Sequence, residues 1–251
     1  MKTPLRGRRI LVTRAAEDAA EWAERLSRHG ARPVIFPCLV STPLGDPGTA
    51  AQLRAALAEA DWLVLSSQRG VQSVAALIGG MLPSKVQIAA VGPATARAAV
   101  TAWKRVNLVA ATPTSEGLAT ELAALVGTPM KAVPVHAVVA GALDGRRDAE
   151  VVLASRGWRV TRVPVYQTLA APVSGDRLNL REGTVDDILL ASPSAVLGLL
   201  NRAVLPCTAR IITIGPTTTA AARAAGLVVA AEARRPGLDG MLEAMQCVNR
   251  S

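Results

Sequence analysis

The chain has few aromatic residues. Only 2% of its 251 residues are aromatic, namely one tyrosine, one phenylalanine and four tryptophans, whereas half are hydrophobic. Its cores must therefore consist mainly of Ala, Val and Leu, an ordinary composition for an α/β protein. Six rings cannot provide the stacking platform on which proteins bind single-stranded nucleic acid, so no nucleic-acid partner is expected.

Histidine and cysteine are also scarce. His29 and His136 are the only histidines, and this scarcity argues against a zinc site and against a Ser-His hydrolase triad. Cys38, Cys207 and Cys247 are odd in number and far apart, which is typical of small buried residues. We therefore expect no metal site and no disulfide framework.

Long apolar runs are absent from the sequence. No stretch approaches the roughly 18 uninterrupted apolar residues of a membrane helix, and Met1 to Arg6 lead directly into a strand-like run. We expect a cytoplasmic protein without a membrane contact. At roughly 150 residues per domain, the length allows one or two domains.

Negative charge is outnumbered by positive charge. The net charge is +9, and 24 of the 28 basic residues are arginines. A polyanionic partner would explain this balance, and so would a GC-rich genome that replaces Lys by Arg. The arginines are scattered along the chain, which favours a small polyanion over nucleic acid.

One short motif occurs twice. Val91 to Ala96 and Ile214 to Thr219 each place Gly-Pro after an apolar run, with a hydroxyl three residues after the Gly. Pro suits the first turn of a helix, so each copy predicts a strand-to-helix turn. Its free N–H groups, beside Thr95 or Thr218, could bind an anion. A single copy would only mark the start of a helix, but two copies half a chain apart indicate an internal repeat.

Strand-like runs alternate with helical patterns along the whole chain. This order predicts βαβ units and hence parallel sheets covered by helices. Gly30 and Pro37 align with Gly157 and Pro164, and Asp61 aligns with Asp186, so we infer a duplicated open α/β unit. Predicted strands include Arg9 to Thr13, Pro33 to Pro37, Asp61 to Leu65, Val86 to Val91, Val106 to Ala110, Ala132 to Val139 and Arg159 to Val165. Predicted helices include one starting at Thr49, capped by that residue with Gln52, and those at Ser115 to Val126 and Gly145 to Arg156.

Neutral polar side chains follow the predicted strands. In an open parallel sheet, ligands bind beyond the carboxyl ends of the strands. Paired carboxylates and a nucleophile–base pair are missing there, which favours positioning of a ligand over general-base catalysis. Each hydroxyl could instead be only a helix cap. The candidate binding residues are Thr13, Arg14, Ser67, Gln68, Thr95, Ser115, Ser192, Ser194 and Thr218.

At these residues the chain resembles the uroporphyrinogen-III synthase family. The likeness covers nearly the whole chain, and although each motif is loose, seven in the right order are specific. The motifs are Leu11 to Arg14, Ser67 to Val71, Val91 to Ala96, Thr114 to Leu118, Val163 to Thr168, Ser192 to Val196 and Ile214 to Thr219.

The resemblance implies a lyase without a cofactor. Such an enzyme closes hydroxymethylbilane into uroporphyrinogen III, with loss of water and inversion of the terminal D ring, on the route to haem, sirohaem and cobalamin. The substrate carries eight carboxylates, which would explain the positive charge. We also expect a monomer that makes a transient contact with the upstream bilane-forming enzyme.

The same resemblance implies two flavodoxin-like lobes with open parallel sheets. Residues 1–38 with 169–251 would form lobe 1, and residues 42–166 would form lobe 2. Two antiparallel linker strands would lie near 38–42 and 166–170. These are equivalent points of the repeat, as an exchange of the first βαβ segment between the copies requires.

Tyr166 is the candidate catalytic residue. It is the only tyrosine, and at the second linker it could hydrogen-bond the departing hydroxyl; alternatively, its ring only packs the hinge. Where the family commonly has Arg-Gly, this chain has Ala140-Gly141, and Arg146 and Arg147 either replace that Arg or form a solvated helix face. The rival function is a two-lobed protein that binds or senses a small anion without chemistry.

Overall fold

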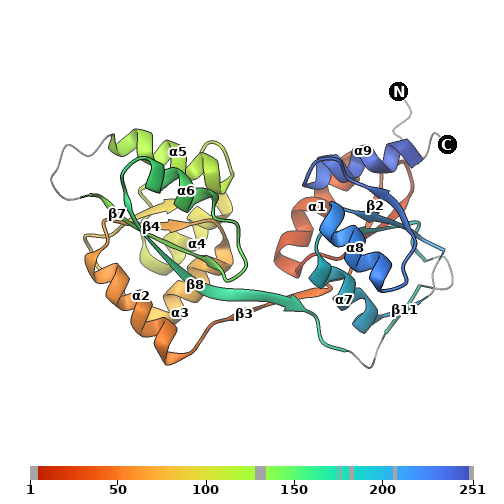
Figure 1. The fold of residues 1–251 in the computed structure, drawn as a ribbon, viewed down its shortest axis with the longest axis horizontal. Helices are drawn as coiled ribbons and strands as arrows, with labels where there is room; N and C mark the ends of the chain where they lie inside the picture. The colour runs from red at the N-terminus through yellow and green to blue at the C-terminus, as the bar shows by residue number, and fades with distance from the viewer. Residues whose placement is uncertain are drawn as a thin grey trace. The chain divides into compact units, whose positions relative to one another are not determined.

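The computed structural model describes residues 5–127, 134–173, 175, 177–180, 184–205 and 208–248. The chain divides into two compact units (Figure 1). Unit 1 comprises Met1–Val40 and Leu169–Ser251, and unit 2 comprises Ser41–Thr168. Each unit contains its own sheet, so each is described separately.

Unit 1 contains a five-stranded parallel sheet with the order β13-β12-β10-β1-β2. A second, two-stranded parallel sheet pairs β9 with β11. The elements are β1 (Arg9–Val12), α1 (Ala16–Arg28), β2 (Arg32–Ile35), β9 (Leu178–Asn179), β10 (Asp187–Leu190), α7 (Pro193–Arg202), β11 (Ala203–Val204), β12 (Arg210–Thr213), α8 (Pro216–Ala224), β13 (Val229–Glu232) and α9 (Leu238–Val248).

The interior strand β1 divides its side chains between the two faces of the unit 1 sheet. Ile10 and Val12 pack in one core with α1 and α9, whereas Leu11 packs in the other core with α7 and α8. All three side chains are fully buried. Because successive side chains of a strand point to opposite faces, a continuous apolar run is what a sheet with two covered faces requires.

Unit 2 is built around a sheet with the order β3-β8-β7-β4-β5-β6. Strands β8, β7, β4, β5 and β6 pair in parallel with their neighbours. Strands β3 and β8 both cross the boundary between the units. The elements are β3 (Leu39–Pro43), α2 (Pro47–Glu59), β4 (Trp62–Leu65), α3 (Gln68–Ile78), β5 (Gln87–Ala90), α4 (Pro93–Trp103), β6 (Leu108–Val109), α5 (Ser115–Val126), β7 (His136–Ala142), α6 (Asp148–Ser155) and β8 (Arg159–Ala170).

The faces of the unit 2 sheet are covered by different helices. Leu63 and Leu65 of β4 pack with α2, α3 and α4, whereas Trp62 and Val64 pack with α5 and α6. Figure 1 shows α5 and α6 on one side of this sheet and α2 and α3 on the other. Burial of each such leucine stabilises the fold by about 1.5–3 kcal/mol. The sheet therefore sits between two layers of helices, and its polar strand ends remain at the edges.

The two sheets share one strand order. Unit 1 runs β2-β1-β10-β12-β13, which in chain order is 2-1-3-4-5, and β8-β7-β4-β5-β6 in unit 2 fills the same places. In unit 2, however, β7 and β8 come last in the chain. The connections leave β1 and β10, and likewise β7 and β4, in opposite directions. Ligands of open α/β sheets bind at such a switch point.

Several predicted element boundaries differ from the structure, among them those of α2, β7 and α6. Helix α2 begins at Pro47 instead of Thr49, because the Asp46 carboxylate caps it by accepting the Thr49 N–H at 2.8 Å. Strand β7 extends to Ala142, beyond the predicted end at Val139, and its predicted start falls partly outside the described residues. Helix α6 begins at Asp148 instead of Gly145, because Arg162 of β8 binds the carbonyl oxygens of Ala142, Leu143 and Gly145 and holds the preceding residues in a loop.

The cysteines only partly match the expectation of buried residues. Cys38 is fully buried, and burial raises the pKa of its thiol to about 12. Cys247 is exposed instead of buried, because it lies off the stripe of α9 that buries Met241, Ala244 and Met245. Cys207 lies outside the described residues.

Candidate functional site

The predicted site residues lie after the carboxyl ends of strands in both units. Because the strands that they follow are parallel within each sheet, these residues gather at one edge of each sheet. In unit 2 they are Ser67 and Gln68 after β4, Thr95 after β5, Ser115 after β6, and Tyr166 within β8. In unit 1 they are Thr13 and Arg14 after β1, Ser192 and Ser194 after β10, and Thr218 after β12.

The phenol of Tyr166 contacts the first turn of α3. Its hydroxyl lies 3.1 Å from Ser67 Oγ, and only 6% of the residue is exposed. The same Oγ accepts the N–H of Gly70 at 3.0 Å and so caps α3. Tyr166 therefore meets both needs of a buried tyrosine, an apolar site for its ring and a partner for its hydroxyl.

A bulge in β8 determines where Tyr166 points. Gly141 pairs with Pro164, but Ala142 pairs with Tyr166, so Val165 is an extra residue on β8. Val165 and Tyr166 consequently both belong to the core beside α3, although neighbouring residues of a regular strand face opposite sides. The sequence contains no local signal for this irregularity.

Arg69 covers the ring of Tyr166. Its guanidinium lies 5.4 Å from the ring centroid, within the range of a cation–π contact. Its Nη1 donates to Ser41 Oγ at 2.9 Å, which ties α3 to β3. The sequence gives no sign of these contacts, because Ser41, Arg69 and Tyr166 are distant in the chain. Together with Ser67, Arg69 fixes the ring of Tyr166 from two directions.

Ser67 and Ser192 occupy equivalent caps in the two units. Ser192 Oγ accepts the N–H of Ala195 at 3.1 Å, just as Ser67 accepts that of Gly70. The cap of α5 is Thr114, whose Oγ1 accepts the N–H of Gly117 at 2.9 Å, and Ser115 is the first helical residue. Gln68 and Ser194 lie in the first turns of α3 and α7. Capping thus occupies two of the predicted hydroxyls, those of Ser67 and Ser192.

Three predicted threonines are buried. Thr13 is fully buried and donates to the Leu189 carbonyl at 2.6 Å, which joins β1 to β10. Thr95 and Thr218 are 4% and 3% exposed, each in the first turn after a Gly-Pro pair. Their helices begin at Pro93 and Pro216, as the motif predicts. Contact with a ligand at Thr95 or Thr218 would therefore fall mainly to the first-turn N–H groups, which lack intrahelical partners.

Arg14 is held beside the end of β1. Its Nη2 lies 3.1 Å from Asp18 Oδ2, and its guanidinium lies 4.8 Å from the centroid of the Trp22 ring. Both partners belong to α1. Because its charge is partly neutralised by Asp18, Arg14 would bind an anion less strongly than an unpaired arginine.

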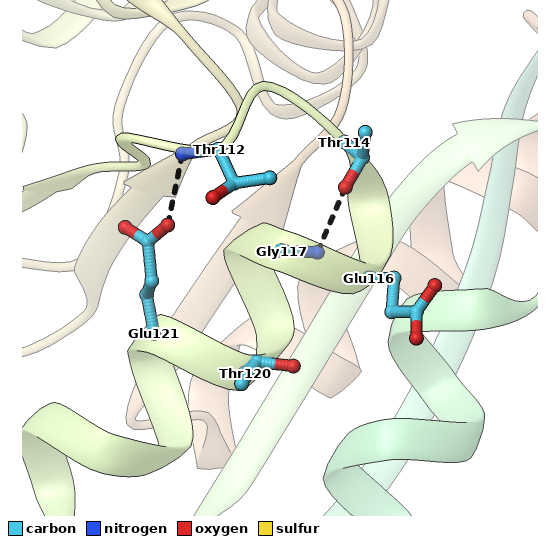
Figure 2. A pocket seen from close by; sticks show the side chains of 6 residues that line it. All are labelled: Thr112, Thr114, Glu116, Gly117, Thr120 and Glu121. Atoms are coloured by element: carbon cyan, nitrogen blue, oxygen red, sulfur yellow. Dashed lines mark hydrogen bonds between the residues drawn. The ribbon is translucent and has the colours of Figure 1, made fainter.

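A hollow lies at the start of α5 (Figure 2). Figure 2 shows the Glu121 carboxylate turned toward the N–H of Thr112, and a second oxygen of this carboxylate accepts the N–H of Ala111. These hydrogen bonds lower the pKa of Glu121. A wall with two carboxylates repels an anionic ligand, so this hollow does not suit a polycarboxylate. It is lined by Thr112, Thr114, Glu116, Gly117, Thr120 and Glu121.

The described residues contain neither a cluster of metal ligands nor a membrane-spanning helix. Across that part of the chain, no three His, Cys, Asp or Glu side chains gather in a way that could hold a metal ion. No helix within the described ranges is long and apolar enough to span a membrane.

These observations define a class of protein. It has two α/β units with parallel sheets, and at the strand ends of both units it presents hydroxyls, helix N-termini and arginines. Such a set of groups suits hydrogen bonding to an anionic ligand.

The comparisons with known proteins name the family. The family model "Uroporphyrinogen-III synthase HemD" matches residues 20–243, which include most of both units. The chain therefore belongs to the uroporphyrinogen-III synthase family, whose members act in porphyrin biosynthesis.

Two relatives agree with this assignment, and one solved structure has a similar fold. A porphyrin biosynthesis protein HemD from Ruminiclostridium josui is 29% identical over 80% of this chain, and the chain spans only 40% of that protein's length. A uroporphyrinogen-III synthase from Synechococcus elongatus is 27% identical over 97% of this chain and 96% of its own. A crystal structure of a mutant uroporphyrinogen III synthase from Thermus thermophilus has a TM-score of 0.50 at 21% identity, over 97% of this chain and 99% of its own; this likeness concerns the fold.

Proposed function

We propose that this protein closes hydroxymethylbilane to uroporphyrinogen III, with inversion of the D ring and loss of water. The observation that carries the proposal is the family match, which extends through both units. The product would supply the routes to haem, sirohaem and cobalamin. The test is to mix the purified protein with freshly made hydroxymethylbilane and to separate the product isomers. We expect mainly isomer III, whereas isomer I alone would refute the synthase and leave an anion-binding protein without chemistry.

Binding by hydrogen bonds is the proposed basis of catalysis. The acetate and propionate groups would be bound by strand-end amides, hydroxyls and arginines of both units, in the conformation from which the inverted ring is attacked. Because the free bilane closes spontaneously to isomer I, the protein must steer as well as accelerate the reaction. No cofactor is required by this mechanism. Activity should therefore survive prolonged dialysis against a chelator, and its loss would contradict that part of the proposal.

Tyr166 is the proposed hydrogen-bond donor to the departing hydroxyl. Ser67 and Arg69 support the proposal because they hold the phenol at the start of α3, beside the end of β4. The structural alternative is that Ser67 alone satisfies the hydroxyl. A donor must be within about 2.6–3.2 Å of the atom it protonates, so the Tyr166–Ser67 bond would have to open or be shared when substrate binds.

We further propose that the chain arose by duplication, with exchange of the first βαβ segment between the copies. Equivalent contacts support this proposal. The Asp186 carboxylate accepts the N–H of Arg9, and the Asp61 carboxylate accepts the N–H of His136, in each case at the start of an interior strand. The N–H of Val91 bonds Leu65 O, and that of Ile214 bonds Leu190 O, both at 3.0 Å. The segments β1-α1-β2 and β7-α6-β8 take the same places in opposite units.

In this duplication the lobes would be residues 1–38 with 169–251 and residues 42–166. The linkers near 38–42 and 166–170 would correspond to parts of β3 and β8, which are neighbours in one sheet. We propose that the protein works as a cytoplasmic monomer and contacts the upstream bilane-forming enzyme transiently. Light scattering would test the monomer, and a dimer at micromolar concentration would contradict it.

A further inference from the structure

Arg162 of β8 ties down the loop that follows β7. Its Nη2 donates to the carbonyl oxygens of Ala142, Leu143 and Gly145 at 2.8, 2.9 and 3.2 Å. Its Nε lies 3.5 Å from Glu150 Oε1 on α6. The side chains of Arg162 and Glu150 are only 19% and 15% exposed. One guanidinium therefore holds both the loop and the helix after it.

An arginine suits this position better than a lysine. Its planar group presents several donors in fixed directions, so Nη2 can serve carbonyls while Nε faces a carboxylate. The single nitrogen of a lysine could serve the carbonyls or Glu150 but not both with the same geometry. The contacts of Arg162 thus specify the shape of the loop and not only its charge.

The loop lies at the switch point of the unit 2 sheet. The chain leaves β7 through α6 toward β8, and it leaves the neighbouring β4 through α3 toward β5. A Cβ built on Gly141 would lie 3.8 Å from Ser66 Oγ, so the end of β7 is next to the residues that follow β4. This is where an open α/β sheet binds its ligand.

The ion pairs of the loop leave one cation without a partner among the described residues. Arg146 Nη2 lies 2.6 Å from Asp148 Oδ2, and Arg162 neutralises Glu150, so both carboxylates in the first turn of α6 are paired. Arg147 is exposed and occupies the N-cap of α6, and within the described part of the chain it forms no ion pair. A positive group thus stands beside a helix N-terminus, which itself favours anions.

We propose that Arg162 is a positioning residue, which fixes residues 142–147 so that Arg147 and the first amides of α6 bind a carboxylate of the substrate. This inference rests on the proposed function. It also distinguishes the two loop cations, since Arg147 binds the ligand while Arg146 pairs with Asp148.

The test compares R147Q, R162Q and the double variant in the cyclisation assay. We expect KM to rise about tenfold in each single variant with kcat little changed, because a contact common to the ground and transition states is lost. The double variant should be no worse than the poorer single one, since both changes remove the same contact. R162K, which keeps the charge, should recover part of the loss.

Arg159 provides the matched control. It lies on the same strand and pairs with Glu59, but its side chain is 53% exposed. R159Q should therefore leave KM unchanged. Unchanged KM in R162Q and R162K, or multiplied losses in the double variant, would overturn the positioning role, even if stability falls. Formation of isomer I alone by the wild type would refute the synthase function. The positioning role can still be tested in that case, because calorimetric binding of uroporphyrin needs no catalysis. About tenfold weaker binding by R147Q and R162Q would support the role, and unchanged binding would contradict it.

Discussion

At the scale of single residues, Ser67 and Tyr166 combine a structural and a proposed chemical role. Ser67 caps α3 and forms a hydrogen bond with the phenol of Tyr166. Loss of the Ser67 hydroxyl should therefore lower stability, whereas loss of the Tyr166 hydroxyl should lower activity. Removal of the cap from Ser67 would cost about 1 kcal/mol of stability. Removal of the Tyr166 hydroxyl leaves the cap and the buried ring in place.

Replacement of Tyr166 by Phe should lower turnover by about 10² or more with little loss of stability, because a positioned proton donor is lost. The measurement is the initial rate together with the isomer ratio. Ser67→Ala is the comparison, since it removes the hydrogen-bond partner of the phenol but keeps the Tyr166 hydroxyl. Full activity of Y166F would leave Tyr166 with the packing role alone.

Asp186 should contribute stability above about pH 4. Arg9 donates two kinds of hydrogen bond to this carboxylate, one from its guanidinium Nη2 at 3.2 Å and one from its backbone N–H at 2.7 Å. These hydrogen bonds lower the pKa of the Asp186 carboxyl in the folded protein. The contribution is therefore complete above the unfolded pKa near 3.9 and is lost as pH falls through the lower folded value. Asp186→Asn should reduce the free energy of unfolding at pH 7 by about 1–3 kcal/mol, as for hydrogen bonds to a charged group.

Urea unfolding at pH 7 and near pH 3 measures this effect. The difference between wild type and variant should shrink at the lower pH. A difference that stays constant would mean that the carboxylate charge of Asp186 is not what stabilises the start of β1.

At the scale of secondary-structure elements, local signals predicted more than distant ones. The Gly-Pro pairs correctly predicted where α4 and α8 begin. The strand end, the tight turn and the first-turn proline lie within a few residues of one another, so the sequence alone shows the helix start. The helix Ser115–Val126 was also correct, since Thr114 caps it and Gly127 follows it. The parallel α/β class followed from the alternation of such elements.

What sequence could not provide depends on contacts across the chain. The loop before α6 is held by Arg162, about 20 residues later, so the start of that helix was predicted too early. The bulge that turns Tyr166 toward α3 arises from pairing between β7 and β8. Among the candidate hydroxyls, the burial of Thr13, Thr95 and Thr218 was equally invisible, because it depends on packing within each unit.

Helix α7 depends on a glycine at its contact with the segment that follows β2. A Cβ built on Gly198 would lie 1.8 Å from the Cys38 carbonyl oxygen. Gly198→Ala should therefore cost about 1–3 kcal/mol in urea unfolding, although alanine favours helices. Gly45→Ala is the control, since nothing lies within 4 Å of its Cβ position. Equal stability of both variants would mean that α7 moves away from Cys38 without cost.

At the scale of the whole molecule, positive charge is shared between the units. Unit 1 contains 16 basic and 11 acidic residues, and unit 2 contains 12 and 8. If arginines bind the carboxylates, KM should rise with ionic strength, because exposed charges are screened beyond a Debye length of about 10 Å at 0.1 M. Initial rates between about 50 and 500 mM salt would measure it. A constant KM would favour binding by backbone amides.

Hydrogen exchange tests whether both units bind the ligand. The proposed contacts are N–H groups at strand ends, so product should protect the turn and first-turn amides after Thr13, Ser67, Gly92, Ser192 and Gly215. Pro93, Pro193 and Pro216 directly follow three of these residues and have no N–H, so there the protected amides are those of the next residues. With ligand at about 100 times its Kd, amides that exchange only from the ligand-free protein should slow about 100-fold. A monocarboxylate at the same ionic strength is the control, and it should protect few of these amides, because it cannot engage several sites at once. Protection confined to one unit would contradict a site that uses both, and the proposed folding of the bilane would have to be abandoned even if isomer III were still formed.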